Sequence, residues 1–132
     1  LFFVFYHEVG HAIVDIYDLP ATGNSEDNAD QVSTFVLLRN GESGIDALLE
    51  GANWFFIKSE ESNVEESMFS DIHSPDRRRY YNLLCWIYGW DPQNGEDLVT
   101  EWDLPKDRAA GCEEEYARMY SSWNRLLSPY LK

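Results

Sequence analysis

His7-Glu8-Val9-Gly10-His11 is the stretch of this sequence that says most about its fold and its chemistry. It lies within residues 1–17, which are apolar almost all round and therefore predict a helix through the middle of a domain. On a helix, residues four apart are neighbours, so both imidazoles can reach one tetrahedral zinc ion. Glu8 projects about 100° away from His7, where its carboxylate can meet a water molecule without binding the metal. The alternative is a helix that carries two ordinary core histidines.

A third ligand is expected from the acidic residues 26–30, which follow on a second helix. A catalytic zinc site needs three protein ligands and an open fourth position. Glu26 and Asp30 are four residues apart, so their carboxylates share one helical face. Residues 19–25 can span up to about 23 Å, enough to return Glu26 to the level of the histidines. We expect Glu26 to bind the metal and Asp30 to accept the free N–H of a ligating histidine, with Asp27 as the rival ligand. Alternatively, these acids only decorate an exposed helix N-terminus.

Helices dominate the rest of the pattern, and no segment alternates strictly between apolar and polar residues. Ser25 and Ser74 are the expected N-cap residues of two helices, and Pro75 suits a first helical position. The acidic run 60–66 is expected to be solvated. The sequence therefore predicts a mainly α fold in one domain covering residues 1–132. The helices after the first are predicted over residues 26–38, 45–59, 75–89, 96–102 and 113–127.

Composition excludes several classes of protein. The 132 residues are enough for one domain with its own core, and their formal net charge is −14. A charge of that sign repels phosphate backbones and anionic lipid, so we expect no nucleic-acid partner. No apolar run approaches the roughly 20 residues that cross a bilayer, so we expect no membrane insertion. Cys85 and Cys112 are too far apart for a Cys-x-x-Cys motif, and the spacing leaves open a disulfide or two free thiols.

The two motifs together, His7-Glu8-x-x-His11 and Glu26-x-x-Ala29-Asp30, resemble those of the gluzincin class of zinc metallopeptidases. The sequence is most similar to a family of bacterial, mostly exported metallopeptidases that is named as a domain of unknown function. The resemblance covers nearly the whole chain. Beyond the two motifs, the residues shared with that family are Asp71, His73, Arg79, Tyr81, Asn82, Leu84, Cys85, Tyr88, Gly89, Leu104, Pro105, Arg108, Ala109, Cys112, Glu115, Tyr116 and Trp123.

This resemblance implies a zincin-like helical core that acts as a zinc metalloendopeptidase on a peptide or protein substrate. His7, His11 and Glu26 are then expected to bind Zn²⁺. Glu8 is expected to be the general base that activates water, and Asp30 to orient a ligand.

Four further residues gain a role from the resemblance. His73 and Arg79 are expected to stabilise the oxyanion that develops on the substrate. The alternative is a structural histidine that caps a helix and an arginine tied to Asp71 or another acid. Cys85 and Cys112 correspond to the pair that is bridged in exported members, which implies a disulfide and a secreted or periplasmic location.

Gluzincins usually place a β-strand upstream of the zinc helix, and an extended substrate pairs with its edge. Only six residues precede His7. We therefore expect that the β-sheet lies outside this chain, or that the molecule lacks an ordinary substrate cleft. Two other functions stay open: a non-catalytic helical module that zinc stabilises and that binds a protein partner, and a metal-free acidic interaction domain. The sequence carries no signal of the oligomeric state.

Overall fold

The computed structural model describes residues 2–61 and 75–131, and in these residues the chain forms helices and no strand. The prediction of a mainly α fold is therefore confirmed for the described residues. The predicted cap Ser74, the candidate His73 and most of the acidic run 60–66 lie outside them. The elements in chain order are α1 (Phe2–Ile16), α2 (Ser25–Leu38), α3 (Glu42–Glu61), α5 (Pro75–Trp90), the 3₁₀ turn η1 (Pro92–Asn94), α6 (Glu96–Thr100), α7 (Lys106–Ala109), α8 (Cys112–Leu127) and η2 (Ser128–Tyr130).

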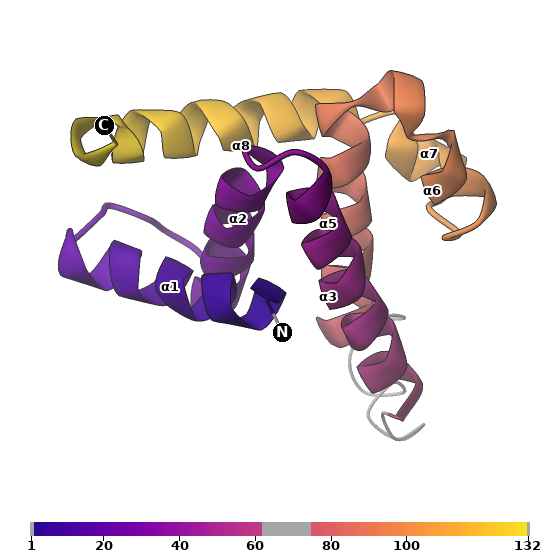
Figure 1. Ribbon diagram of the computed structural model, residues 1–132, viewed down its shortest axis with the longest axis horizontal. Helices are drawn as coiled ribbons and strands as arrows, with labels where there is room; N and C mark the ends of the chain where they lie inside the picture. Colours follow the sequence, from indigo (N-terminus) through magenta and orange to yellow (C-terminus); the bar gives the residue numbers. More distant parts are fainter. Residues whose placement is uncertain (1, 62–74, 132) are drawn as a thin grey trace.

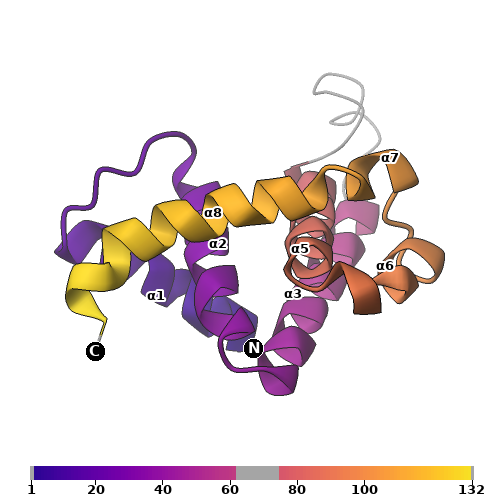
Figure 2. The same cartoon turned by 90° about the horizontal axis from the view of Figure 1, so that it is seen from above.

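The helices pack mainly in three pairs: α1 against α2, α3 against α5, and α5 against α8. Helix α8 lies across one side of the molecule (Figure 1), and the view from above shows that it crosses both α2 and α5 (Figure 2). None of the described helices is long and apolar enough to span a bilayer. The centre of the core consists of fully buried side chains from α2, α3 and α5, namely Val32, Phe35, Leu48, Phe55, Leu83 and Leu84.

Helix α2 begins one residue earlier than predicted, and its N-cap is Asn24 instead of Ser25. The side-chain Oδ1 of Asn24 accepts hydrogen bonds from the backbone N–H groups of Glu26, at 2.8 Å, and Asp27, at 3.3 Å. Asparagine and serine are about equally good caps, so the sequence alone could not rank them. The cap fixes the first turn of α2, which carries the candidate ligand Glu26.

Several other helix ends differ from the prediction because local signals define them only loosely. Helix α3 starts at Glu42, directly after Gly41 in the left-handed region with φ 66°. Helix α6 ends at Thr100, and α8 starts at Cys112, where the sequence predicted 102 and 113. The four-residue helix α7 was not predicted at all.

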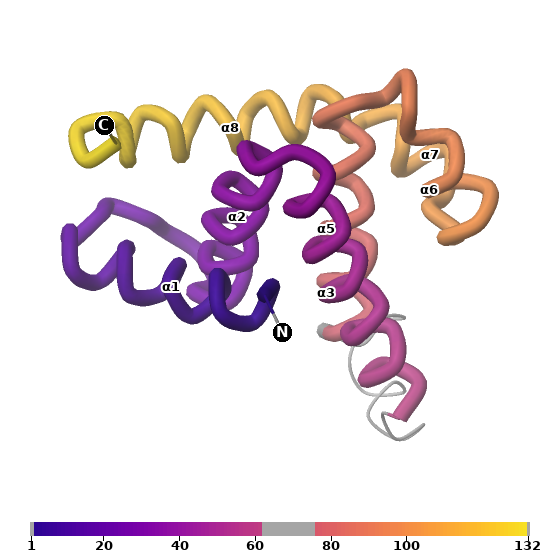
Figure 3. Tube along the Cα trace, in the orientation of Figure 1, coloured from indigo at the N-terminus to yellow at the C-terminus, as the bar shows by residue number. Residues whose placement is uncertain are grey.

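Helices α1 and α2 come into close contact at Gly10. A Cβ atom on this residue would lie 2.9 Å from the carbonyl oxygen of Ala29 and 3.3 Å from the Cβ of Val32. Only glycine permits this approach without a shift of the backbone. The tube drawing shows the chain leaving α1 through a loop and returning as α2 beside it (Figure 3). The facing sides of α1 and α2 are therefore within reach of each other's side chains.

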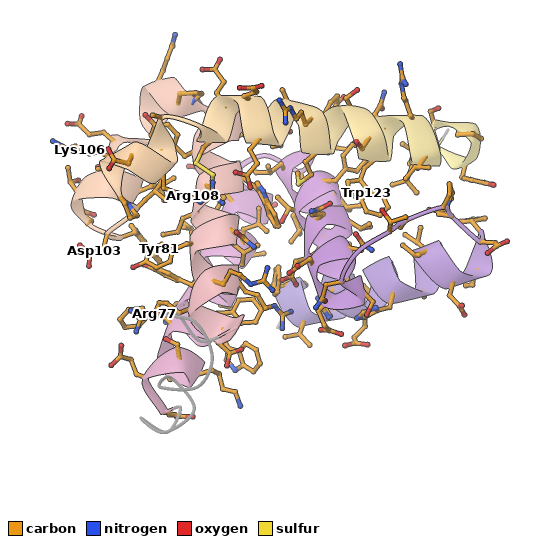
Figure 4. All side chains as sticks on the ribbon, turned by 180° about the vertical axis from the view of Figure 1, so that it is seen from behind. Arg77, Tyr81, Asp103, Lys106, Arg108 and Trp123 are labelled. Carbon is orange, nitrogen blue, oxygen red and sulfur yellow. A yellow bond between two sulfur atoms is a disulfide. The ribbon has the colours of Figure 1, made fainter. Side chains whose placement is uncertain are left out.

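A disulfide joins Cys85 in α5 to Cys112 at the start of α8, as the family resemblance implied. Both cysteines are fully buried. Arg108 of α7 covers the pair: its Nη1 lies 2.8 Å from the Sγ of Cys85, and its Nη2 donates to Glu115 at 3.1 Å. Figure 4 labels Arg108 beside the helices that it joins. The disulfide thus fixes α5 against α8.

Candidate metal centre

Three predicted metal ligands meet where α1 faces α2. The Nε2 atoms of His7 and His11 are 3.1 Å apart. The carboxylate of Glu26 lies 3.1 Å from each of them, with Oε2 toward His7 and Oε1 toward His11. Within residues 2–61 and 75–131, this is the one group of at least three histidine, cysteine, aspartate or glutamate side chains whose ligand atoms all lie within 4.8 Å of one another.

The geometry of these donor atoms fits a zinc ion. Ligands at about 2.0–2.1 Å from a tetrahedral zinc are about 3.3 Å apart, and the observed separations of 3.1 Å are close to that value. Two imidazole nitrogens and one carboxylate oxygen also form a donor set that is typical of catalytic zinc sites. Three protein donors leave the fourth tetrahedral position to water or substrate.

Asp30 fixes the orientation of His7 from the side opposite the metal ligands. Its Oδ1 lies 2.7 Å from the Nδ1 of His7, and only 2 % of the Asp30 side chain is exposed. This hydrogen bond raises the pKa of His7 above 6.5, although burial acts in the opposite direction. A neutral His7 that donates its Nδ1–H to Asp30 presents a lone pair at Nε2. That lone pair and the Oε2 of Glu26 are then two facing acceptors, which a cation between them would satisfy.

Arg79 of α5 binds the carboxylate of Asp30 through two hydrogen bonds. Its Nε donates to Oδ2 of Asp30 at 2.8 Å, and its Nη2 donates to Oδ1 at 2.9 Å. The same Nη2 lies 3.7 Å from the Oε2 of Glu26. Burial alone would lower the pKa of Arg79, but the hydrogen bond and the charge of Asp30 outweigh it and raise this pKa above the ordinary value of an arginine. The guanidinium also lies over the ring of Phe55, 4.2 Å from its centroid.

A groove of about 670 Å³ opens beside the ligands, between α1 and the start of α2. Glu8 and His11 line it from α1, and Asn28 and Ala29 line it from α2. Glu8 is exposed, whereas only 7 % of His7 is. The groove therefore gives solvent and larger molecules access to the side of the site where Glu8 and His11 lie.

Arg77 and Arg78, which precede Arg79 in α5, form ion pairs with acids of neighbouring helices. Arg77 pairs with Glu60, and Arg78 pairs with Asp27 at 3.0 Å. Asp27, the rival ligand, thus faces Arg78 and does not join the group around the histidines. His73 lies outside the described residues, so the structure places it neither in the site nor away from it.

Sequence reasoning did not find the bond between Asp30 and Arg79, although it considered that Arg79 could be tied to an acid. The two residues are 49 positions apart, and no local pattern joins them. Nor did the sequence single out Phe55 as a support for the guanidinium. Only the packing of α5 and α3 beside α2 reveals these contacts.

Comparison with known proteins bears on the family of this chain. One family model, described as "Putative metallopeptidase", matches residues 1–127, which include the candidate ligands, Arg79 and both cysteines. No curated protein and no solved structure gives a match. Because the match extends over almost the whole sequence, the chain belongs to this metallopeptidase family, DUF4344.

Proposed function

We propose that this chain is a zinc-dependent metallopeptidase in which residues 1–132 form a single zincin-like core. One observation carries the proposal: the Nε2 atoms of His7 and His11 lie 3.1 Å apart, and each lies 3.1 Å from one carboxylate oxygen of Glu26, next to an open groove. The description of the family supports the same activity. The family resemblance points to an endopeptidase that acts on peptide or protein substrates.

The proposed mechanism assigns each step to a side chain of this site. His7, His11 and Glu26 would hold the metal, which would supply Lewis acidity for the attack of water on the peptide carbonyl. The carboxylate of Glu8 accepts a proton from the attacking water. Glu8 then donates this proton to the departing amine nitrogen as the C–N bond breaks. Glu8 lines the same groove as His11, which supports this role.

Oxyanion stabilisation is proposed first for His73, which precedes α5 in the sequence. Arg79 is the second donor that the resemblance implies. Because its Nε and Nη2 both donate to Asp30, its Nη1 is the group with which it would reach a substrate oxygen.

We further propose a secreted or periplasmic location. The buried disulfide between Cys85 and Cys112 supports it, because such bonds persist in oxidising compartments. The location of exported family members gives the same expectation.

The proposal is tested with Glu8→Gln, which keeps the size of the side chain and removes the base. We expect about one zinc ion per chain in both proteins, measured by mass spectrometry of the metal content. Hydrolysis of an unfolded protein substrate should fall at least about 100-fold in the variant, since a general base contributes roughly that factor or more. Glu42→Gln, an exposed glutamate in the first turn of α3, is the matched control and should keep full activity. A wild-type protein without stoichiometric zinc, or unchanged hydrolysis by Glu8→Gln, would refute the proposal.

A second candidate is a non-catalytic module that zinc stabilises and that binds a protein partner. It is favoured by the large apolar side chains that α1 exposes, with Phe2 69 %, Phe5 60 % and Ile16 74 % accessible. Two results together would select this function over hydrolysis. The protein would bind zinc tightly without cleaving any unfolded protein, and it would bind a protein partner that the variant Phe5→Ser no longer binds.

A further inference from the structure

We propose that Arg79 is a positioning residue of the metal centre. It holds the carboxylate of Asp30, and through Asp30 it holds His7 in the orientation that binds metal. The inference rests on the metal site of the proposed function but does not require that the protein cleaves peptides.

The geometry at Asp30 supports this role. Oδ1 receives hydrogen bonds from both His7, at 2.7 Å, and Arg79 Nη2, at 2.9 Å, while Oδ2 receives one from Arg79 Nε, at 2.8 Å. Two parallel bonds from a planar guanidinium fix the plane of a carboxylate as well as its position. The oxygen that faces His7 is therefore held at a defined place, and the imidazole ring follows it.

Burial makes this support necessary. The Asp30 side chain is only 2 % exposed, so water does not replace a lost partner. An ionised carboxylate in such a place needs both a counter-charge and hydrogen bonds. Arg79 supplies the counter-charge, and its Nη2 also lies 3.7 Å from Glu26, so one cation faces the two acids of α2 that belong to this site, Asp30 and Glu26.

Arg79 is itself held firmly. Its guanidinium lies over the ring of the fully buried Phe55 in α3, and its own helix α5 packs against α3 and α8. The disulfide from Cys85 further ties α5 to α8. The orientation of His7 thus depends on a side chain that is packed against the core instead of on an exposed surface residue.

A role of Arg79 that is confined to contact with the substrate fits the structure less well. The groove beside the ligands is lined by Glu8 and His11 but not by Arg79. The Arg79 side chain is only 16 % exposed, compared with 48 % for its neighbour Arg78. Most of the hydrogen-bonding edge of Arg79 faces Asp30 and not the groove.

The test compares the zinc dissociation constants of Arg79→Lys, Arg79→Met and the wild type, measured at fixed pH by competition with a chromogenic chelator. We expect Arg79→Met to bind zinc about 10- to 100-fold more weakly, as is usual when a partner of a ligating histidine is disturbed. Arg79→Lys keeps the charge but loses the two-point contact, so it should recover only part of the affinity. Arg78→Met is the matched control: it removes the adjacent arginine, which bonds to Asp27, and should leave the constant unchanged.

Two results would overturn the inference. If Arg79 acted only as a nearby positive charge, Arg79→Met would bind zinc more tightly than the wild type. If it acted only on the substrate, kcat would fall while the zinc dissociation constant stayed the same.

A metal-free measurement keeps the test independent of hydrolysis and of the folding of Arg79→Met. In the apo protein, the Nδ1–H proton of His7 should give a downfield proton NMR signal because of its bond to Asp30. We expect this signal in the wild type and in Arg78→Met, and its loss or broadening in Arg79→Lys. An unchanged signal in a folded Arg79→Lys protein counts against the role proposed for Arg79, even if the wild type proves to have no peptidase activity.

Discussion

Substitution of Gly10 by alanine should disturb the metal centre without touching any ligand. The new Cβ would lie 2.9 Å from the carbonyl oxygen of Ala29, whereas ordinary contacts begin at 3.4 Å. Because the obstacle is backbone, α1 has to move away from α2 by about 0.5 Å. Metal–ligand distances tolerate only about 0.2 Å, so this shift separates His7 and His11 from Glu26 by more than a zinc ion accepts.

We expect two effects of Gly10→Ala. The free energy of unfolding of the apo protein should fall by about 1–3 kcal/mol, the usual result of overpacking. The zinc dissociation constant should rise at least about tenfold, since the ligands no longer converge without strain. Thermal denaturation of the apo protein and a zinc titration of the folded protein measure the two effects separately.

Gly111→Ala is the matched control, because the nearest atom to its new Cβ is 3.9 Å away and the residue has φ −98°. Gly111→Ala should shift the melting temperature of the apo protein by no more than a few degrees. It should leave the zinc affinity unchanged. If Gly10→Ala melted and bound zinc like this control, the close contact of α1 and α2 would not be what sets the ligand geometry, and the reasoning would be refuted.

Two further predictions concern stability. Replacing Cys85 and Cys112 by alanine should lower the free energy of unfolding by about 3 kcal/mol, because the bond closes a loop with a sequence separation of 27; urea denaturation measures this, and a loss below about 1 kcal/mol would contradict it. Burial raises the pKa of Tyr80 from 10.0 to about 12. Since the folded state then holds this proton more tightly than the unfolded state, the contribution of Tyr80 to stability is complete below pH 10 and is lost as the pH rises toward 12. Urea denaturation of the wild type and of Tyr80→Phe at pH 9 and pH 11 should show the smaller pH effect in the variant, and equal slopes would count against it.

Local signals in the sequence were enough to predict most helices. Pro75 marks the start of α5, and the apolar residues 1–17 predict a helix where α1 lies. The expectation that this helix runs through the middle of the domain is wrong, because α1 buries only one face and exposes Phe2, Phe5 and Ile16. The same signals could not choose Asn24 over Ser25 as a cap, since both side chains can accept the same hydrogen bonds. A helix as short as α7 has too few residues to show a period.

The candidate site also has a part that local sequence predicts and a part that it does not. The spacing of four residues predicts that His7 and His11 share one face of α1, because that pair depends only on the geometry of one helix. The contact between Asp30 and Arg79 depends instead on how α5 packs beside α2, which no local pattern encodes. The family resemblance drew attention to Arg79, but it did not identify the partner.

The positions of the site residues along the chain also bear on the order in which the site forms. The three candidate ligands all fall within residues 7–26, so a short loop is enough to bring them together, and closing a short loop costs little chain entropy. Arg79 follows much later and arrives only when α5 docks. We therefore expect a helical hairpin of α1 and α2 to bring the donors near one another first, and the docking of α5 then to fix the orientation of His7 through Asp30.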